Sequence, residues 1–188
     1  EVAPASARFA RPPAYMWLGR LRLGMAIEAT VGDALRERGE FVAAAESCTG
    51  GLVGSLLTDI PGSSEYFDRS VVTYSYDSKM EHLGVPREVL DDVGAVSAPV
   101  AEQMARGVRD VAGVTWGVAT TGIAGPDGGT DEKPVGTVYI AVSHAAEWGT
   151  GDSWCRAERY GFDGSRREIK RQIAERALED LLEAIESA

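Results

Sequence analysis

Apolar segments of strand length and of helix length alternate along this sequence, and that alternation constrains the fold more than any other feature. Strands are expected where β-branched and aromatic residues cluster, and helices where apolar residues recur every three or four positions. Helices that alternate with strands cover a sheet on both faces, so we expect a three-layer α/β/α sandwich. The expected strands are 41–45, 67–75, 114–121, 135–143 and 154–162, and the expected helices are 26–38, 52–60, 78–83, 86–93, 98–112 and 165–186.

The last two expected strands, 135–143 and 154–162, are joined by a turn-rich stretch that indicates an antiparallel hairpin. The earlier strands are separated by helices, which is typical of parallel neighbours. We therefore expect a mixed, mostly parallel sheet within a single domain at 25–188. Residues 1–24 are rich in Ala, Pro and Arg and show no clean period. They are expected to form a tail that is poorly ordered or not native, with Met25 as the native start.

Composition and charge exclude several classes of protein. The chain has 19 basic and 29 acidic residues and a net charge of −10, which disfavours general binding of nucleic acid. No apolar run approaches the roughly 18 residues that a membrane-spanning helix needs. Cys48 and Cys155 are too few for a disulfide framework or a four-ligand zinc site, and His82 and His144 have no carboxylate or cysteine at ligand spacing. We expect a soluble, cytoplasmic protein without a metal.

The first candidate for chemistry is the turn at 46–51, Glu-Ser-Cys-Thr-Gly-Gly, between an expected strand and an expected helix. A helix N-terminus directs backbone N–H groups and a partial positive charge at an anion, and Gly50 and Gly51 permit close approach. Three consecutive residues there could serve as a nucleophile: Ser47, Cys48 and Thr49. The alternative is that one of these hydroxyl groups merely caps the helix.

The second candidate is Lys79. Lysine occurs only three times, so a reaction that needs an amine base has three candidates: Lys79, Lys133 and Lys170. The spacing of Ser78 and Glu81 predicts a capping box that places Lys79 at the first helical position, where the helix dipole and burial would lower its pKa. A serine nucleophile can use such a lysine as its base. Alternatively, Lys79 is an exposed loop residue. Tyr74 nearby could orient the lysine or the substrate, or simply pack.

The third candidate is the segment 121–129, Thr-Gly-Ile-Ala-Gly-Pro-Asp-Gly-Gly, which follows an expected strand. Its glycines and its proline set unusual backbone geometry at the carboxyl end of that strand. Ligands of open α/β sheets bind at such ends, and a loop this long is more often functional than accidental. The alternative is a flexible excursion.

Taken together, these motifs resemble the CinA C-terminal domain family, whose stand-alone members are nicotinamide-nucleotide amidohydrolases. The resemblance extends from about residue 26 to the C-terminus. The matching segments are 45–51, 72–75 with Lys79, 94–97, 121–129 with 133–138, and 162–166, where Ser165 replaces the usual Asp.

The resemblance implies hydrolysis of the carboxamide of nicotinamide mononucleotide (NMN) to nicotinate mononucleotide and ammonia, a step in pyridine nucleotide salvage. It implies no metal or cofactor, and a homo-oligomer. By position, the nucleophile falls on Ser47, the general base on Lys79 and the tyrosine of the same site on Tyr74. This assignment disfavours Cys48 as the nucleophile.

The remaining implied contacts hold the substrate. Backbone N–H groups at 49–51 or at 121–122 are expected to stabilise the oxyanion, and the loop 125–129 with Arg166 to bind the phosphate, although Arg167 and Arg171 are close in sequence. The expected binding residues are Thr49, Gly50, Gly51, Thr121, Gly122, Gly125, Gly128, Gly129 and Arg166. Two alternatives stay open: a non-catalytic nucleotide-binding module, and an amidase that acts on another small amide.

Overall fold

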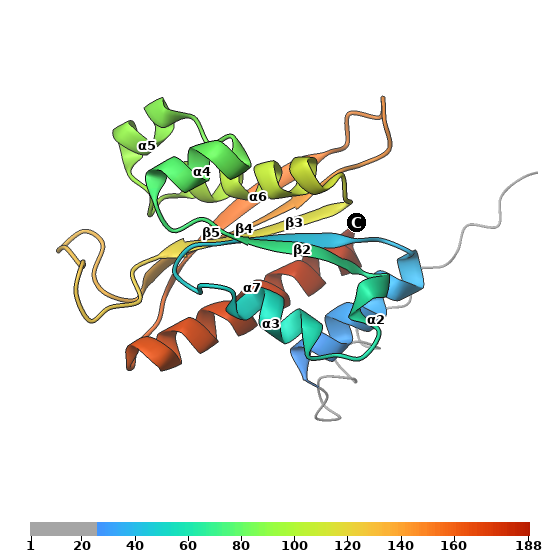
Figure 1. Ribbon diagram of the computed structural model, residues 1–188, viewed down its shortest axis with the longest axis horizontal. Helices are drawn as coiled ribbons and strands as arrows, with labels where there is room; N and C mark the ends of the chain where they lie inside the picture. Colours follow the sequence, from blue (N-terminus) through green and yellow to red (C-terminus); the bar gives the residue numbers. More distant parts are fainter. Residues whose placement is uncertain (1–25) are drawn as a thin grey trace, which may run out of the picture.

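The computed structural model describes residues 26–188, which form a five-stranded sheet between two layers of helices (Figure 1). The expected tail at 1–24 and Met25 lie outside the described residues. The helices are α2 (Ile27–Arg38), α3 (Leu52–Thr58), α4 (Tyr76–Leu83), α5 (Arg87–Val93), α6 (Ala98–Ala112) and α7 (Arg166–Ser187), with a short 3-10 helix η1 (Ser63–Glu65). Helices α4, α5 and α6 cover one face of the sheet, and α2, α3 and α7 cover the other. The expected three-layer sandwich is confirmed.

The sheet has the strand order β2-β1-β3-β4-β5. Strand β1 pairs in parallel with β2 and β3, whereas β4 pairs antiparallel with β3 and β5. Four strands therefore run in one direction and β4 runs in the other, which confirms a mixed sheet and the expected hairpin. The strands are β1 (Val42–Glu46), β2 (Phe67–Val72), β3 (Trp116–Gly122), β4 (Thr137–His144) and β5 (Trp154–Gly161).

Strand β1, which lies between β2 and β3, is buried over its whole length. Its side chains alternate between the two faces, as the pleat of a strand requires. Val42 and Ala44 join the core under α2, α3 and α7, and Ala43 and Ala45 join the core under α4 and α6. The same alternation directs Glu46, the last residue of the strand, toward the α3 side.

Each face of the sheet has its own hydrophobic core. On one face, Met104 of α6 is fully buried against the alanines of the strands. On the other face, Trp116 and Tyr66 are fully buried in the core that also contains the apolar side chains of α7. The apolar stripe of α7 is buried along five successive turns: Ile169, Ile173, Ala177, Leu181 and Ile185.

Helix α4 begins earlier than the sequence predicts. Ser75, not Ser78, is the N-cap, and Ser75 and Ser78 form the capping box with each other. The prediction of a Ser78–Glu81 box was therefore wrong, because two serines three positions apart compete as caps and the upstream one extends the helix. Lys79 consequently lies at the fourth helical position, away from the first turn where the helix dipole acts most strongly.

Strands β1, β2 and β3 end together at one edge of the sheet. Glu46 at the end of β1 pairs with Val72 of β2 and with Thr120 of β3. The segments that follow these strands therefore leave from the same edge, and α7 begins near it after β5 (Figure 1). This edge carries the candidate site.

Candidate functional site

Ser47 and Lys79 meet at the carboxyl edge of the sheet. Ser47 is the first residue after β1, and the Lys79 side chain reaches it from α4, 32 positions further along the chain. The distance from Lys79 Nζ to Ser47 Oγ is 3.1 Å. A serine hydroxyl and an amine at hydrogen-bond distance have the geometry that a nucleophile and its base require.

Lys79 is fully buried and has no ion-pair partner among the described residues. Its Nζ atom donates a hydrogen bond of 2.6 Å to the carbonyl oxygen of Thr73, the residue after β2. Burial disfavours the charged ammonium, so the pKa of Lys79 falls from 10.5 to about 8. The cause is burial rather than the helix dipole that the sequence suggested. With this pKa, a minority of the lysine is neutral near pH 7 and about half is neutral at pH 8.

The other two lysines have different surroundings. Lys133 lies in the loop before β4 and donates to the carbonyl oxygen of Val93 at 3.2 Å. Lys170 on α7 is partly exposed and lies beside Gly50. Of the three lysines, Lys79 is the one that is fully buried.

The thiol of Cys48 is buried next to Ser47. Burial raises its pKa to about 12, so the sulfur stays protonated and is a poor nucleophile at neutral pH. Thr49 is also buried, and its hydroxyl shares a hydrogen bond of 2.8 Å with the hydroxyl of Thr120. Of the three possible nucleophiles, Ser47 is the one that contacts an amine.

A carboxylate of the protein itself occupies the N-terminus of α3. Glu46 is fully buried and accepts hydrogen bonds from the N–H groups of Gly51, Val53 and Gly54. The N–H of Gly51 is therefore not available to an oxyanion, contrary to the expectation for this residue. The carboxylate does not engage Thr49 or Gly50 in this way, so their N–H groups remain candidates.

Sequence reasoning missed the role of Glu46. Its signal was an acidic residue at the end of an otherwise apolar strand, a few positions before a helix begins. Neither Ser47 nor Thr49 makes a side-chain cap to α3, so the expected capping alternative is wrong.

Tyr74 lies at the same edge but points outward. It follows Thr73 in the β2–α4 connection, and its side chain is 63% exposed. The guanidinium of Arg166, at the start of α7, donates to the Tyr74 hydroxyl at 3.2 Å and to the carbonyl oxygen of Gly125 at 2.5 Å. The structure thus brings Tyr74, Arg166 and the β3–β4 loop together, while Tyr74 makes no hydrogen bond to Ser47 or Lys79 among the described contacts.

Thr121 and Gly122 lie inside β3 rather than in a turn, which corrects the sequence assignment of Gly122. The Thr121 hydroxyl donates to the carbonyl oxygen of Ala95 at 2.8 Å, which links β3 to the segment before α6. At Gly122 a Cβ atom would lie 2.6 Å from a methyl group of Val138, so close packing accounts for this glycine.

Gly128 and Gly129 lie in the exposed part of the β3–β4 loop. The φ of Gly128 is +90°, a conformation that glycine adopts readily. At Gly129 a Cβ atom would lie 2.7 Å from the backbone nitrogen of Val135. The structure thus accounts for both glycines by backbone geometry, and their contact with a substrate stays a prediction.

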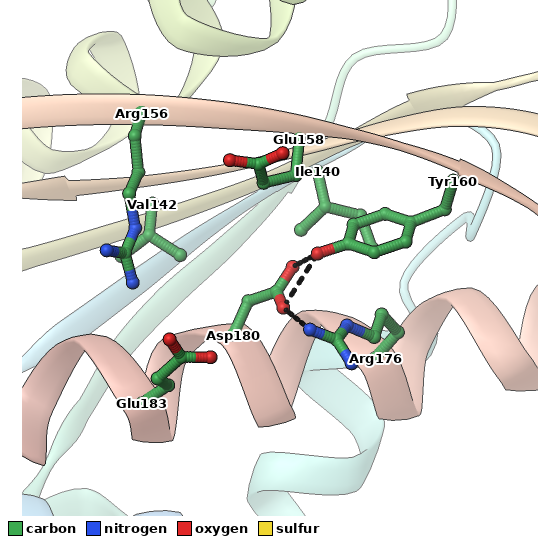
Figure 2. Close-up of a pocket in the computed structure, with 8 residues that line it drawn as sticks. All are labelled: Ile140, Val142, Arg156, Glu158, Tyr160, Arg176, Asp180 and Glu183. Carbon is green, nitrogen blue, oxygen red and sulfur yellow. Dashed lines mark hydrogen bonds and ion pairs between the residues drawn. The ribbon is translucent and has the colours of Figure 1, made fainter.

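Two hollows lie near α7. An open groove of about 870 Å³ is lined by Leu52 and by residues from Asp163 to Gln172, so it adjoins the start of α3. A smaller cavity of about 230 Å³ lies between β4, β5 and α7, where Asp180 accepts from the Tyr160 hydroxyl and pairs with Arg176 (Figure 2). Ser47 and Lys79 line neither hollow.

No helix among the described residues is long and apolar enough to cross a membrane. In the same part of the chain, no three His, Cys, Asp or Glu side chains form a group that could hold a metal ion.

The fold and the site define an α/β protein with a buried serine–lysine pair at the carboxyl edge of its sheet. A family model described as the CinA C-terminal domain matches residues 25–185. The chain belongs to the CinA C-terminal domain family, as the sequence motifs predicted.

Curated relatives agree with this assignment. A CinA-like protein of Geotalea uraniireducens is 51% identical over 147 residues, which are 78% of this chain and 33% of that protein. A CinA-like protein of Geobacter metallireducens is 49% identical over 156 residues, which are 83% of this chain and 36% of that protein. The chain thus spans about a third of the length of these relatives.

Solved structures share the fold. The crystal structure of the competence/damage inducible protein CihA from Agrobacterium tumefaciens matches with a TM-score of 0.76 and 42% identity, over 85% of this chain and 93% of that one. A CinA superfamily protein from Klebsiella pneumoniae matches with a TM-score of 0.79 and 31% identity, over 86% of this chain and 97% of that one.

Proposed function

We propose that this protein hydrolyses the carboxamide of nicotinamide mononucleotide to nicotinate mononucleotide and ammonia, with Ser47 as nucleophile and Lys79 as general base. The observation that carries the proposal is the 3.1 Å contact between the Ser47 hydroxyl and a fully buried amine whose pKa is about 8. The substrate class is proposed from the resemblance of the sequence motifs to the family. The proposal also includes a cytoplasmic setting and self-association.

The first half of the reaction forms an acyl-enzyme. Neutral Lys79 donates one N–H to the Thr73 carbonyl, which leaves its lone pair free to accept the Ser47 proton. As the proton moves to Nζ, Ser47 Oγ bonds to the amide carbon and the carbonyl oxygen becomes an oxyanion. The C–N bond then breaks, and Lys79 returns the proton to the departing ammonia.

In the second half of the reaction, water hydrolyses the acyl-enzyme, with Lys79 again as the base. Water attacks the ester carbon while Lys79 accepts its proton, and the ester bond to Ser47 Oγ breaks. Lys79 then returns the proton to the serine oxygen, and the product leaves as a carboxylic acid that ionises to nicotinate in solution. Every proton transfer passes through one amine, which therefore has to titrate near the working pH.

The oxyanion of each tetrahedral intermediate needs hydrogen-bond donors. Because Glu46 accepts the N–H of Gly51, we assign this task to the N–H groups of Thr49 and Gly50. One donor of this kind lowers a barrier by about 3–4 kcal/mol in comparable sites. For the phosphate we retain Arg166 and the loop 125–129, since Arg166 already contacts that loop at Gly125.

The test is ammonia release from NMN by the purified chain, with Ser47→Ala and Cys48→Ala side by side. We expect wild-type turnover, a fall in kcat of at least about a thousandfold in Ser47→Ala, and near-normal turnover in Cys48→Ala. Cys48→Ala is the matched control because it removes the neighbouring buried side chain and leaves the amine contact in place.

Other outcomes would point to other functions. Binding of NMN by calorimetry without turnover would indicate a nucleotide-binding module. Faster turnover of another small amide, ranked by kcat/KM, would change the substrate but not the mechanism. Full activity of Ser47→Ala would refute the mechanism.

A further inference from the structure

Glu46 is a buried carboxylate with four hydrogen-bond donors around it. Its Oε2 atom accepts from the N–H of Gly51 at 2.8 Å and of Val53 at 3.1 Å. Its Oε1 atom accepts from the N–H of Gly54 at 2.9 Å and from the Ser70 hydroxyl at 2.7 Å. One side chain thus joins the end of β1, the start of α3 and strand β2.

The backbone on either side of the Glu46–Ser47 peptide bond is hydrogen-bonded as well. Its carbonyl oxygen accepts from the N–H of Thr73 at 2.8 Å, and the next N–H, that of Ser47, donates to the Thr120 carbonyl at 3.0 Å. The carbonyl oxygen of Thr73 in turn holds the amine of Lys79. Glu46 is therefore bonded to the segments that carry both members of the pair.

These contacts close the turn that contains Ser47. The turn leaves β1 at Glu46, and the carboxylate of the same residue ties Gly51, Val53 and Gly54 back to that point. The short connection between Glu46 and Gly51, which contains Ser47, is therefore held at both of its ends. A displacement of about 1 Å at a reacting group can cost about a hundredfold in rate, so such a constraint bears directly on catalysis.

We infer that Glu46 is the positioning residue for Ser47: its carboxylate fixes the β1–α3 turn so that Ser47 Oγ stays within reach of Lys79 Nζ. This inference rests on the proposed Ser47–Lys79 function. Glu46 acts through the turn and does not touch the reacting atoms.

The role requires a carboxylate rather than an amide. In Glu46→Gln, one oxygen becomes an NH₂ group and faces donors. If it replaces Oε2, it faces the N–H groups of Gly51 and Val53, and if it replaces Oε1, it faces Gly54 N–H. The Ser70 hydroxyl can rotate to accept, but a backbone N–H cannot. At least one N–H at the start of α3 therefore loses its partner in either orientation.

The test compares Glu46→Gln with Asp180→Asn. Asp180 is also a buried carboxylate, but its partners Tyr160 and Arg176 lie beside the cavity shown in Figure 2, away from the predicted site residues. Both variants remove one buried charge. We expect both to lower the melting temperature, which separates loss of stability from loss of positioning.

Turnover of NMN per folded molecule is the first readout. For Glu46→Gln we expect kcat to fall about a hundredfold with KM changed less than about threefold. The pH midpoint should stay near 8, because the burial of Lys79 is unchanged. Asp180→Asn should keep kcat within about twofold of the wild type. Normal kcat in Glu46→Gln, or an equal loss in Asp180→Asn, would overturn the inference.

Labelling of Ser47 by a fluorophosphonate, followed by mass spectrometry, is the second readout and needs no NMN. If the wild type is labelled at Ser47 but does not turn NMN over, the proposed substrate fails while slower labelling of Glu46→Gln still supports the inference. Equal labelling would overturn it. If the wild type shows neither labelling nor turnover, the proposed function and the inference both fail.

A second variant covers the case in which Glu46→Gln does not fold. Ser70→Ala removes one of the four donors to the carboxylate and leaves the charge in place. We expect labelling and kcat to fall severalfold, less than in Glu46→Gln. Unchanged labelling and turnover in Ser70→Ala would then count against the inference.

Discussion

Lys79 is buried without a carboxylate partner among the described residues, so folding has to desolvate an amine. Its partners are a serine hydroxyl and a backbone carbonyl oxygen, which stabilise the charged form less than an anion would. The same burial that lowers the pKa to about 8 therefore destabilises the protein whenever the lysine is protonated.

Replacement of Lys79 by methionine should abolish turnover and stabilise the protein at neutral pH. The lowering of the pKa from 10.5 to about 8 corresponds to about 3 kcal/mol. Loss of the hydrogen bond to Thr73 returns about 1 kcal/mol of this. We expect the free energy of unfolding of Lys79→Met to exceed that of the wild type by about 2 kcal/mol at pH 7, measured by urea titration.

The stability difference between Lys79→Met and the wild type should depend on pH. Between pH 8 and 10.5 the unfolded lysine holds a proton that the folded one has lost, so wild-type stability rises with pH in that window. The advantage of Lys79→Met should be full below pH 8 and shrink as pH rises to 10.5. The buried Cys48 thiol opposes this trend above pH 9, but it is common to both proteins. An advantage that does not change with pH would contradict the account.

At the residue scale, the motifs identified Ser47 and Lys79, but spacing alone could not bring them together. Their contact depends on β1 and β2 being neighbours and ending at the same level. Glu46 was missed because three of its four hydrogen bonds come from backbone N–H groups, which no residue type marks in the sequence. The expectation for Gly51 failed for the same reason, since the Glu46 carboxylate already accepts its N–H.

At the scale of elements, α4 holds Lys79 and is itself packed against α6. Gly107 of α6 makes this possible, because a Cβ atom there would lie 2.1 Å from the carbonyl oxygen of Leu83 at the end of α4. An alanine in a helix is otherwise better than glycine by roughly 1 kcal/mol. A clash with a backbone atom cannot be relieved by rotating a side chain, so the packing term should exceed this gain.

Gly107→Ala should therefore destabilise the protein by about 1–3 kcal/mol and reduce kcat, since α4 has to move to admit the methyl group. The matched control is Gly161→Ala at the end of β5, where a Cβ atom meets nothing within 4 Å. Thermal melts and NMN turnover of both variants provide the measurement. Equal stability of Gly107→Ala and the wild type would show that α4 is not fixed by this contact.

The ends of a helix were predictable where proline and glycine mark them clearly in the sequence. Helix α6 runs over the predicted 98–112, with proline in its first turn and Gly113 at its end. Ser97 precedes it, but its hydroxyl donates to the Gly94 carbonyl rather than capping the helix. Strand β2 ends at Val72 rather than at 75, because Ser75 is used as the cap of α4.

At the scale of the whole molecule, the two cores contain residues from Val31 to Ile185. We propose that 25–188 is the folding unit, as the sequence indicated. A chain that begins at Met25 should melt within about 2 °C of the full chain and show the same kcat, because it keeps every core residue named among the described residues 26–188. A large loss of stability or activity on removal of 1–24 would contradict this proposal.

The layered architecture could be predicted because alternating periodicities are a property of the whole chain. Strand order could not be predicted from spacing, because it depends on which strands lie side by side. The structure places β1 between β2 and β3, so the carboxyl ends of these three strands lie at one edge. The site is a consequence of that order.

In the proposed mechanism, a neutral Lys79 activates Ser47. The most direct measurement is kcat/KM for ammonia release from NMN between pH 6 and 10, for the wild type and Lys79→Met in parallel. We predict that wild-type kcat/KM rises with pH and levels off above about 8, and that Lys79→Met is at least about a thousandfold slower throughout. Comparable turnover by Lys79→Met, or a wild-type profile that is flat through pH 8, would contradict the claim.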